Sequence, residues 1–559
     1  MEQTPERDVT EKRKERIKNW LKDYHNITFI AILLFAIIIR LYYFNLTKNQ
    51  PLWWDESDYL AYAKNLAGLP ANWIITTQHN SLYPYLAAFF FKLNLSEAIA
   101  KFLLQFIPSV LSVVLVYFIC KEMYEDRRIA IVSSFLMAVL WEHLFNTMRF
   151  HIDILALFFG LLAIYAYWKG YEKKEKIFKK ISSKWAIPLT AFLVVLTYTI
   201  RRGYFLFAFF FTLHALTTKK FSELIKDKYN WIALSLGVLL FFLAEKSIFI
   251  SRIQGVSGAY FHPENKINLL PLGVFPAYFS STTSIPSILL YLYWIGFIIL
   301  IANIFLSLGY LKKLTKTTVR ADLFNLFTIL ITLAFFILII RTQDVFGEGR
   351  WFFPLALGSF VCIARSSIFI TDFFRKYNKY FAYAALFILI ILGGYYEIIQ
   401  ADAIIKNKGG SFEGIRQASI YLKELSNQED VIISVAVPQV IYYAERNVVQ
   451  PDKIAGWTGA GEQLPLDDFI NGLKNFPYAR YLLISFSQTG TPDWMARAYG
   501  NNGQVAGWEI KFMDTKIDFS TGQQDIKRTK TLEGATFNLL DIKQDVFIYE
   551  IKRENGSLV

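Results

Sequence analysis

Three carboxylates stand close together near the start of the chain, where Asp55, Glu56 and Asp58 follow two tryptophans. A carboxylate within hydrogen-bond reach of a hydroxyl group can accept its proton as the oxygen attacks an electrophilic carbon. Acidic residues also favour the N-termini of helices, because they complement the helix dipole and cap backbone N–H groups. The cluster therefore indicates either a site for reactions at the membrane-water boundary or a helix cap.

Two more groups of ionisable residues lie beside long apolar runs. Arg149 and Asp153 are four residues apart, a spacing that would let them pair on one face of a helix. Arg350 precedes two phenylalanines, a tryptophan and a proline, which is typical of a boundary anchor in a membrane protein. Ionisable groups at such places are costly unless they are paired or functional. Both groups are therefore candidates for a site.

The elements that must position these residues are membrane helices. The chain has 559 residues, of which 54% are hydrophobic, and its mean hydropathy is +0.32, which is too apolar for a soluble protein of this size. Apolar runs of about 17 to 25 residues, the length of a membrane-spanning helix, recur between residues 27 and 400. They predict a polytopic α-helical membrane protein with about eleven spans. The predicted spans are 27–44, 97–120, 128–145, 152–168, 185–200, 203–217, 230–250, 286–311, 321–340, 351–371 and 380–399.

The distribution of lysine and arginine predicts the orientation. Residues 1–26 form a basic tail, and every second connection between spans is also basic, as expected of cytoplasmic segments. The carboxylate cluster, the 147–152 and 341–350 connections and the C-terminal domain then share the extracytoplasmic face of a plasma membrane. Because the net charge of +13 collects at cytoplasmic helix ends, beside anionic lipid headgroups, no nucleic-acid partner is expected. The two cysteines, Cys120 and Cys362, form no disulfide framework.

The segments outside the predicted spans form three parts. Residues 45–96 are an interfacial first outer loop of the membrane domain 27–400, with an amphipathic stretch at 59–66 and a short apolar helix after residue 81. Residues 401–559 alternate helix-like and strand-like segments, which indicates an extracytoplasmic α/β domain. Its predicted helices are 412–426 and 467–476, and its predicted strands are 431–435, 440–443, 481–485 and 546–550.

The order of these motifs resembles the GT-C superfamily of membrane glycosyltransferases. The resemblance rests on the acidic pair in the first outer loop, the stretch from His79 to Pro84, the Arg149 and Asp153 motif, and Arg350 with the aromatic residues and proline after it. The nearest branch is that of protein O-mannosyltransferases and lipid A aminoarabinose transferases. The resemblance implies a GT-C fold and transfer of a sugar from a polyprenyl phosphate or diphosphate to a protein, lipid or glycan acceptor outside the cytoplasm.

By the same resemblance, Asp55 is the general base of a single inverting displacement. Phosphate leaving groups need fixed positive donors, and the forked guanidinium of arginine suits phosphate oxygens. His79 takes the basic position of relatives, but this chain lacks the two prolines that commonly follow it there. The other candidates are Glu56 and Asp153 as further acids, and Arg350, Arg149, Arg201 and Arg202 as ligands of the donor phosphate.

Two questions stay open in the sequence. Some GT-C enzymes use a divalent cation, but no ligand spacing in this chain has the signature of a metal motif. The residues that could hold such a cation are Asp55, Glu56, Asp153, His79, His151 and His262. The alternative function is a multi-span transporter in which Arg149, Asp153 and Glu245 line the path, although the internal repeats usual in transporters are not evident.

Overall fold

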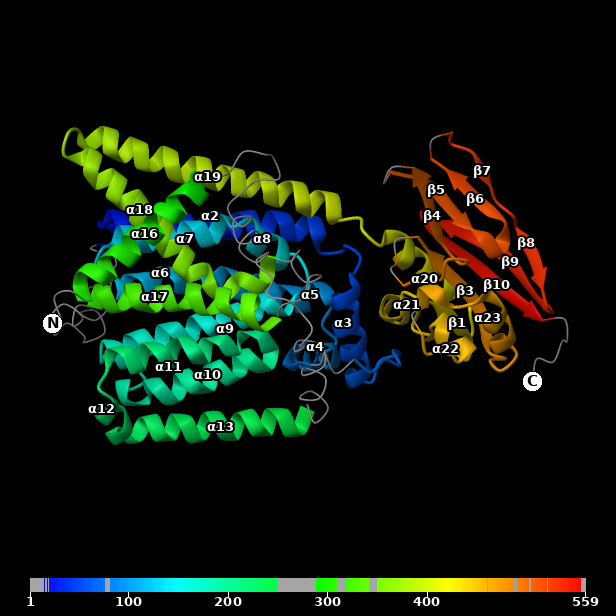
Figure 1. Cartoon of the computed structure of the whole chain (residues 1–559), viewed down its shortest axis with the longest axis horizontal. Helices are drawn as coiled ribbons and strands as arrows, with labels where there is room; N and C mark the ends of the chain where they lie inside the picture. The colour runs from blue at the N-terminus through cyan, green and yellow to red at the C-terminus, as the bar shows by residue number, and fades with distance from the viewer. Residues whose placement is uncertain are drawn as a thin grey trace, which may run out of the picture. The chain divides into compact units, whose positions relative to one another are not determined.

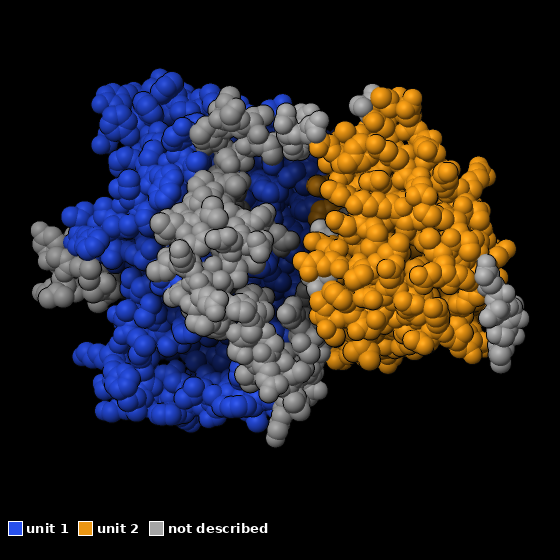
Figure 2. All heavy atoms as spheres, turned by 45° about the vertical axis from the view of Figure 1, so that its right-hand side comes forward, with its two compact units in different colours: residues 1–48, 98–406 blue, residues 49–97, 407–559 orange. Residues whose placement is uncertain are grey.

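The structure is a computed structural model that describes residues 20–75, 81–248, 288–308, 317–340, 349–459 and 461–553, together with Glu15 and Lys18 and without Ser487, Thr489, Asn502, Gly503 and Ser520. His79, His262 and the 341–348 connection lie outside these ranges. The chain divides into two compact units, residues 1–48 with 98–406 and residues 49–97 with 407–559, which Figure 2 shows in two colours. We call them the membrane unit and the outer-loop unit.

The membrane unit consists of helices (Figure 1). Among the described residues, nine helices are long and apolar enough to cross a membrane, or ten if one bent pair forms a single span. The predicted membrane protein is confirmed, whereas the predicted count of eleven spans is not. Its elements are α2 Tyr24–Thr47, α5 Glu97–Lys101, η1 Phe102–Phe106, α6 Ile107–Met123, α7 Arg127–Val139, α8 Trp141–Thr147, α9 Ile152–Ala166, η2 Tyr167–Glu172, η3 Ser183–Trp185, α10 Ala186–Ile200, η4 Arg202–Phe205, α11 Leu206–Thr218, α12 Phe221–Lys226, α13 Lys228–Ile248, α16 Ile288–Leu308, α17 Thr317–Ala334, η5 Phe335–Ile340, η6 Gly349–Leu355, α18 Ala356–Arg375 and α19 Lys379–Lys408.

Two of the predicted spans differ from the structure. The 203–217 run forms the 3-10 helix η4 followed directly by α11, and the 13 residues of α11 are fewer than the approximately 20 needed to cross the hydrocarbon core. The 128–145 run forms α7 and α8, which are bent by 51° with respect to each other. Apolar composition therefore located both segments, but it could not predict where the helices begin and end.

Helix α18 lies at the centre of the membrane unit. In the span Gly349–Arg375, which contains α18, 83% of the most apolar 18-residue window is buried. The corresponding share is 17% for α13, which lies beside α10 at one side of the unit (Figure 1). A Cβ atom added to Gly296 on α16 would lie 1.8 Å from the carbonyl oxygen of Cys362 on α18. The two helix backbones are therefore in contact, which requires glycine at this position.

The outer-loop unit combines α3 Trp54–Ala67 and α4 Leu82–Lys92 with the C-terminal residues. The larger sheet has the strand order β2-β1-β3-β10-β9-β8, in which β2, β1 and β3 are parallel and the others antiparallel; the second sheet, β4-β5-β6-β7, is antiparallel. The strands are β1 Val431–Ser434, β2 Asn447–Val449, β3 Ala479–Ser485, β4 Arg497–Asn501, β5 Gln504–Ile510, β6 Thr515–Asp518, β7 Gln524–Asp525, β8 Thr529–Leu532, β9 Ala535–Lys543 and β10 Val546–Arg553. The helices among them are α20 Glu413–Leu425, α21 Val437–Ala444, α22 Pro451–Ala455, η7 Gly461–Gln463, α23 Leu466–Leu473 and η8 Lys511–Met513.

The predicted α/β character is confirmed, and one predicted strand is wrong. Residues 440–443 belong to helix α21, in which Val437, Val440, Ile441 and Ala444 are all buried. These positions have helical spacing, and Pro438 stands in the first turn, where a helix accepts proline. Their β-branched side chains had favoured a strand, which a run of four residues cannot distinguish from a buried helix.

Candidate active site

Helix α3 carries the three carboxylates near its N-terminus, and they differ in burial. The Glu56 carboxylate accepts the Trp53 N–H over 2.7 Å and so caps the helix, while Asp58 accepts the indole N–H of Trp73 over 2.6 Å. Both side chains are buried, whereas Asp55, in the first turn, is only partly buried. Of the three carboxylates, Asp55 is therefore the one whose position suits contact with a substrate.

Helix α21 of the C-terminal part holds α3 in place. The Lys64 ammonium group donates to the carbonyl of Tyr442 over 3.0 Å and to Glu445 over 3.1 Å. Near the two ends of residues 49–97, the hydroxyl of Tyr443 accepts the Leu52 N–H over 2.9 Å, and the hydroxyl of Tyr442 donates to Glu97 over 2.7 Å. Residues 49–97 therefore pack with the C-terminal part, although the sequence grouped them with the membrane domain.

The pKa of Glu445 reflects this contact. Burial alone would raise its pKa, but hydrogen bonds from Lys423 and Lys64 outweigh burial and lower the pKa below its ordinary value of 4.5. Glu445 therefore carries its charge throughout the physiological pH range, and the ion pair that fastens α3 persists there.

In the membrane unit, Asp153 is surrounded by arginines from distant segments. Its carboxylate lies 3.1 Å from Nε of Arg201 and 3.8 Å from Nη1 of Arg350, and it is completely buried. The Arg201 guanidinium also lies 5.4 Å from the centre of the Trp351 ring. Arg149, 1% exposed, precedes α9. We call Arg149, Arg201 and Arg350 with Asp153 the arginine cluster.

The local structure explains how these residues reach one place. Asp153 lies in the first turn of α9, Arg201 follows the last residue of α10, and Arg350 lies in the 3-10 turn η6. A Cβ atom at Gly349 would lie 2.9 Å from the carboxyl carbon of Glu142, so glycine lets η6 approach α8. The connections between helices, rather than the helices themselves, supply the basic groups.

The predicted pairing of Arg149 and Asp153 on one helix face does not match this geometry. Helix α9 begins at Ile152, so Arg149 lies in the turn before it and the four-residue spacing is not helical. The partners of Asp153 instead include Arg201 and Arg350, which the sequence had named only as separate candidates. Arg202 is the next residue along the chain and opens η4.

A buried polar network supports the connection between α8 and α9. The side chain of Gln105 donates to the carbonyl of His151 over 2.9 Å, and the His151 ring contacts the side-chain oxygen of Asn146. Burial, reinforced by the positive charges of Arg350, Arg149, Arg201 and Lys101, lowers the pKa of His151 well below its ordinary value. His151 is therefore neutral and does not add to the positive charge.

Sequence reasoning missed Lys101 and Gln105. Lys101 is completely buried, donates to the carbonyl of Thr47 over 3.3 Å and lies 5.1 Å from the centre of the Phe150 ring. A lysine inside an apolar run is itself a signal for function, since such a residue must be paired or must serve a site.

The candidate metal ligands of the membrane unit, Asp153 and His151, lie among basic residues. Within those residues, no group of three or more histidine, cysteine, aspartate or glutamate side chains could hold a metal ion. Asp153 lies against two arginines, which makes it a poor ligand for a cation, and His151 is enclosed by positive charges. Asp153 and His151 therefore do not suit a divalent cation.

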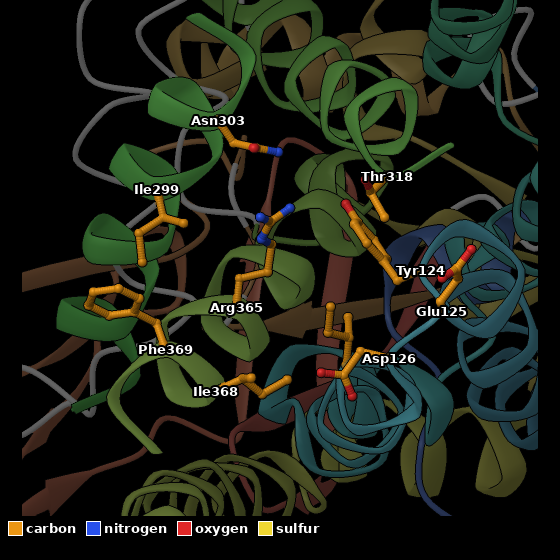
Figure 3. A pocket seen from close by; sticks show the side chains of 10 residues that line it. Tyr124, Glu125, Asp126, Ile299, Asn303, Thr318, Arg365, Ile368 and Phe369 are labelled. Atoms are coloured by element: carbon orange, nitrogen blue, oxygen red, sulfur yellow. The ribbon is translucent and has the colours of Figure 1, made fainter. Parts of the chain in front are cut away.

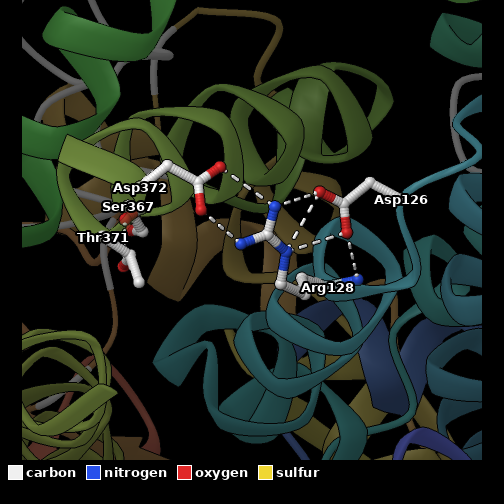
Figure 4. Close-up of polar contacts among 5 residues, drawn as sticks. All are labelled: Asp126, Arg128, Ser367, Thr371 and Asp372. Atoms are coloured by element: carbon white, nitrogen blue, oxygen red, sulfur yellow. Dashed lines mark hydrogen bonds and ion pairs between the residues drawn. The ribbon is translucent and has the colours of Figure 1, made fainter. Parts of the chain in front are cut away.

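A cavity of about 430 Å³ lies near the other ends of α7 and α18 from the arginine cluster (Figure 3). Arg365 of α18 and Asn303 of α16 line it, together with apolar residues of both helices. Arg365 forms an ion pair with the buried Asp322. Beside the cavity, the Arg128 guanidinium bridges the carboxylates of Asp126 and Asp372 over 2.7 Å each (Figure 4). These arginines therefore have structural partners.

Comparison with known proteins identifies the fold. Residues 78–245 match the family model described as dolichyl-phosphate-mannose-protein mannosyltransferase. ArnT from Cupriavidus metallidurans, bound to undecaprenyl phosphate, aligns over 94% of this chain and 97% of its own with a TM-score of 0.57 at 10% identity. The chain has the GT-C fold. The resemblance predicted from the order of motifs is confirmed.

Two further structures with the GT-C fold are similar to the chain. The Archaeoglobus fulgidus oligosaccharyltransferase aligns over 84% of this chain and 70% of its own, with a TM-score of 0.54 and 15% identity. The mycobacterial arabinofuranosyltransferase AftD aligns over 94% of this chain but 40% of its own, with a TM-score of 0.50 and 10% identity. Among curated proteins, none matches the sequence.

Proposed function

We propose that the protein is a membrane glycosyltransferase that transfers a sugar from a polyprenyl-phosphate or diphosphate donor to a protein, lipid or glycan acceptor, with inversion at the anomeric carbon. The observation that carries this proposal is the arginine cluster at the connections of α8, α10 and η6 in a GT-C fold. Two guanidinium groups at one carboxylate, with Arg149 as a further positive charge near His151, leave a net positive charge, which suits a lipid phosphate.

The leaving group explains why arginine is required. When the anomeric C–O bond breaks, negative charge develops on the lipid phosphate, and fixed donors in a site of low dielectric constant stabilise that charge. Arg350 and Arg201 present forked guanidinium groups, which can contact two phosphate oxygens at once. In our proposal Arg350 contacts the phosphate, Arg201 and Arg149 supply further positive charge, and Asp153 orients the guanidinium groups.

Asp55 is the general base in this proposal. It accepts the proton of the acceptor hydroxyl while the oxygen attacks the anomeric carbon, and a single carboxylate is enough for one inverting displacement. The partial burial of Asp55 supports this choice, because Glu56 and Asp58 are buried. His79 and Arg202 stay candidates for the donor phosphate.

The molecules bound in the similar structures support the classes of substrate. ArnT was solved with undecaprenyl phosphate, and the Archaeoglobus fulgidus oligosaccharyltransferase was solved with a tethered acceptor peptide. We extend these classes to this chain, with the donor in the lipid membrane. The basic connections further favour a plasma-membrane protein whose N-terminus is cytoplasmic and whose C-terminal domain is extracytoplasmic.

Asp55→Asn tests the proposal directly. The purified full chain is incubated with polyprenyl-phosphate sugars, and sugar transfer, binding of polyprenyl phosphate and thermal unfolding are measured in parallel. We expect the variant to lose transfer while it still binds the lipid phosphate and unfolds at the wild-type temperature. Full transfer by Asp55→Asn would refute its role as base, and failure of the wild type to bind polyprenyl phosphate would refute the donor class.

A further inference from the structure

A broken helix lies next to the arginine cluster. Helices α7 and α8 meet at a bend of 51°, and Leu140 between them leaves the helical conformation with ψ of 115°. Sharp bends in helices usually coincide with proline or with glycine and serine pairs. The residues around this bend, 136–142, include none of these. The break therefore needs another cause.

Charged side chains bind the backbone groups that the break releases. A continuous helix would donate the Trp141 N–H to the carbonyl of Met137. Instead, the Trp141 N–H is donated to Glu397 of α19 over 3.1 Å. Arg40 of α2 donates to Met137 O over 3.3 Å and to the next carbonyl, Ala138 O, over 2.9 Å. One arginine and one glutamate from two distant helices thus satisfy both sides of the break.

Arg40 also binds α6 and α8. It donates from Nε to the hydroxyl of Ser109 over 2.7 Å and from Nη2 to Nδ1 of His143 over 3.0 Å. Because a guanidinium group can only donate, the His143 ring accepts at Nδ1 and carries its proton on Nε2. Arg40 is completely buried and Glu397 is 4% exposed. Buried charges of this kind are expensive in a membrane and are retained where they have a function.

Helix α8 connects the break to the arginine cluster. Its His143 ring packs edge-on to Phe353 of η6 at 5.9 Å, and its Glu142 lies against Gly349, the neighbour of Arg350. At its other end, the chain passes directly into Arg149. A rotation of α8 would therefore move basic residues on both sides of the cluster.

We propose that Arg40 and Glu397 are positioning residues, which hold the break open so that α8 sets the geometry of the arginine cluster for the donor phosphate. This inference rests on the proposed function. Neither residue contacts the substrate, and each acts through the backbone of α7 or α8. A continuous α7–α8 helix would carry Glu142 and Arg149 in a different direction.

The test compares variants of the break with a matched buried ion pair elsewhere in the membrane unit. Arg40→Lys keeps the positive charge but lacks the fork that reaches two carbonyls. Glu397→Met removes the acceptor at similar volume, whereas Glu397→Gln retains an acceptor oxygen. Asp322→Asn, at the Arg365 pair near the cavity, is the control. Each full-length variant is reconstituted in nanodiscs for measurement of kcat, KM for the lipid-phosphate sugar, and thermal unfolding.

A structural readout accompanies the kinetics. Spin labels on Phe145→Cys of α8 and Leu213→Cys of α11 report the position of α8, because the native Cys120 and Cys362 are buried. We expect Arg40→Lys and Glu397→Met to broaden the label distances and to lower kcat by about tenfold to hundredfold, with KM changed by less. Glu397→Gln should keep both kcat and the label distances close to their wild-type values. The control should lower the unfolding temperature and leave kcat and the label distances unchanged.

Two outcomes separate this inference from the proposed function. Suppose that the wild type transfers sugar, but the break variants lose activity only in proportion to their loss of stability and keep the wild-type label distances. The positioning role of Arg40 and Glu397 is then wrong, while the proposed glycosyltransferase function still holds. If the wild type transfers no sugar, the proposed function fails, while the label distances still decide whether Arg40 and Glu397 position α8.

Discussion

Replacement of Arg350 by glutamine should raise the free energy of the transition state of sugar transfer far more than it lowers the stability of the fold. Arg350 lies 3.8 Å from Asp153, beyond hydrogen-bond distance, whereas Arg201 lies at 3.1 Å. Coulomb's law with an effective dielectric constant of about 20 gives attractions of roughly 4 kcal/mol for Arg350 and roughly 5 kcal/mol for Arg201 before desolvation is subtracted. Arg201 therefore holds Asp153 more firmly, and Arg350 is better placed to bind phosphate.

The expected effect follows from the loss of one fixed donor. Removal of such a donor typically lowers kcat by about 10² to 10³, which corresponds to about 2.7 to 4 kcal/mol of transition-state stabilisation. We expect Arg350→Gln to lose this amount in kcat/KM for the lipid-phosphate sugar. Arg350→Lys should recover part of it, because lysine restores the charge but not the forked contact. Arg201→Gln should lower the unfolding temperature more than Arg350→Gln.

The assay needs a control that removes an arginine away from the cluster. Arg128 bridges Asp126 and Asp372 near the start of α7, so Arg128→Gln should lower the unfolding temperature without changing kcat/KM (Figure 4). If Arg350→Gln changed kcat/KM no more than Arg128→Gln does, Arg350 would not contact the leaving group. The argument that the arginine cluster binds the donor phosphate would then fail.

Three other changes probe the elements around the site. Glu56→Ala should destabilise the protein by about 0.5 to 2 kcal/mol through loss of the α3 cap, whereas Glu56→Gln should keep transfer activity; loss of transfer in that variant would reveal a chemical role. Because the pKa of Glu445 lies below its ordinary 4.5, its contact with Lys64 stabilises the protein above that pH and is lost as the pH falls through the lowered pKa. The unfolding temperatures of Glu445→Gln and wild type should therefore converge in acid, and a constant difference down to low pH would contradict this reasoning. Gly296→Ala should destabilise the membrane unit by about 1 to 3 kcal/mol in denaturation, since the new methyl group would collide with Cys362; wild-type stability would show that α16 and α18 can separate at little cost.

The sequence predicted the parts of the fold that depend on local composition. The lengths of the apolar runs located the membrane helices, and strand-like runs located β1, β3 and β10 correctly. The break between α7 and α8 could not be predicted, because its cause is not local. Its charged partners, Arg40 and Glu397, lie about a hundred or more residues away along the chain.

The candidate site was predicted as separate residues rather than as an arrangement. Asp153, Arg201 and Arg350 were each recognisable as ionisable groups at helix ends, but only the fold shows that they meet. The sequence placed Asp153 and Arg149 on one helix face because four residues separate them, and that placement is wrong because α9 begins between the two. Spacing predicts contact only within one continuous helix.

The buried Arg40 has a consequence for the synthesis of the protein in the membrane. As α2 enters the bilayer, its arginine has only the Ala36 carbonyl of the same helix as a partner, because Ser109 follows 69 residues later and His143 follows 103 residues later. An unpaired arginine at the centre of a helix opposes insertion by about 2.5 to 3.5 kcal/mol. The most apolar 18-residue window of α2 contains this arginine and still has a mean hydropathy of 2.4, and its apolar residues must outweigh that cost alone. The first helix therefore depends on its apolar residues for entry into the bilayer, and its arginine gains its partners only when α6 to α8 have been made.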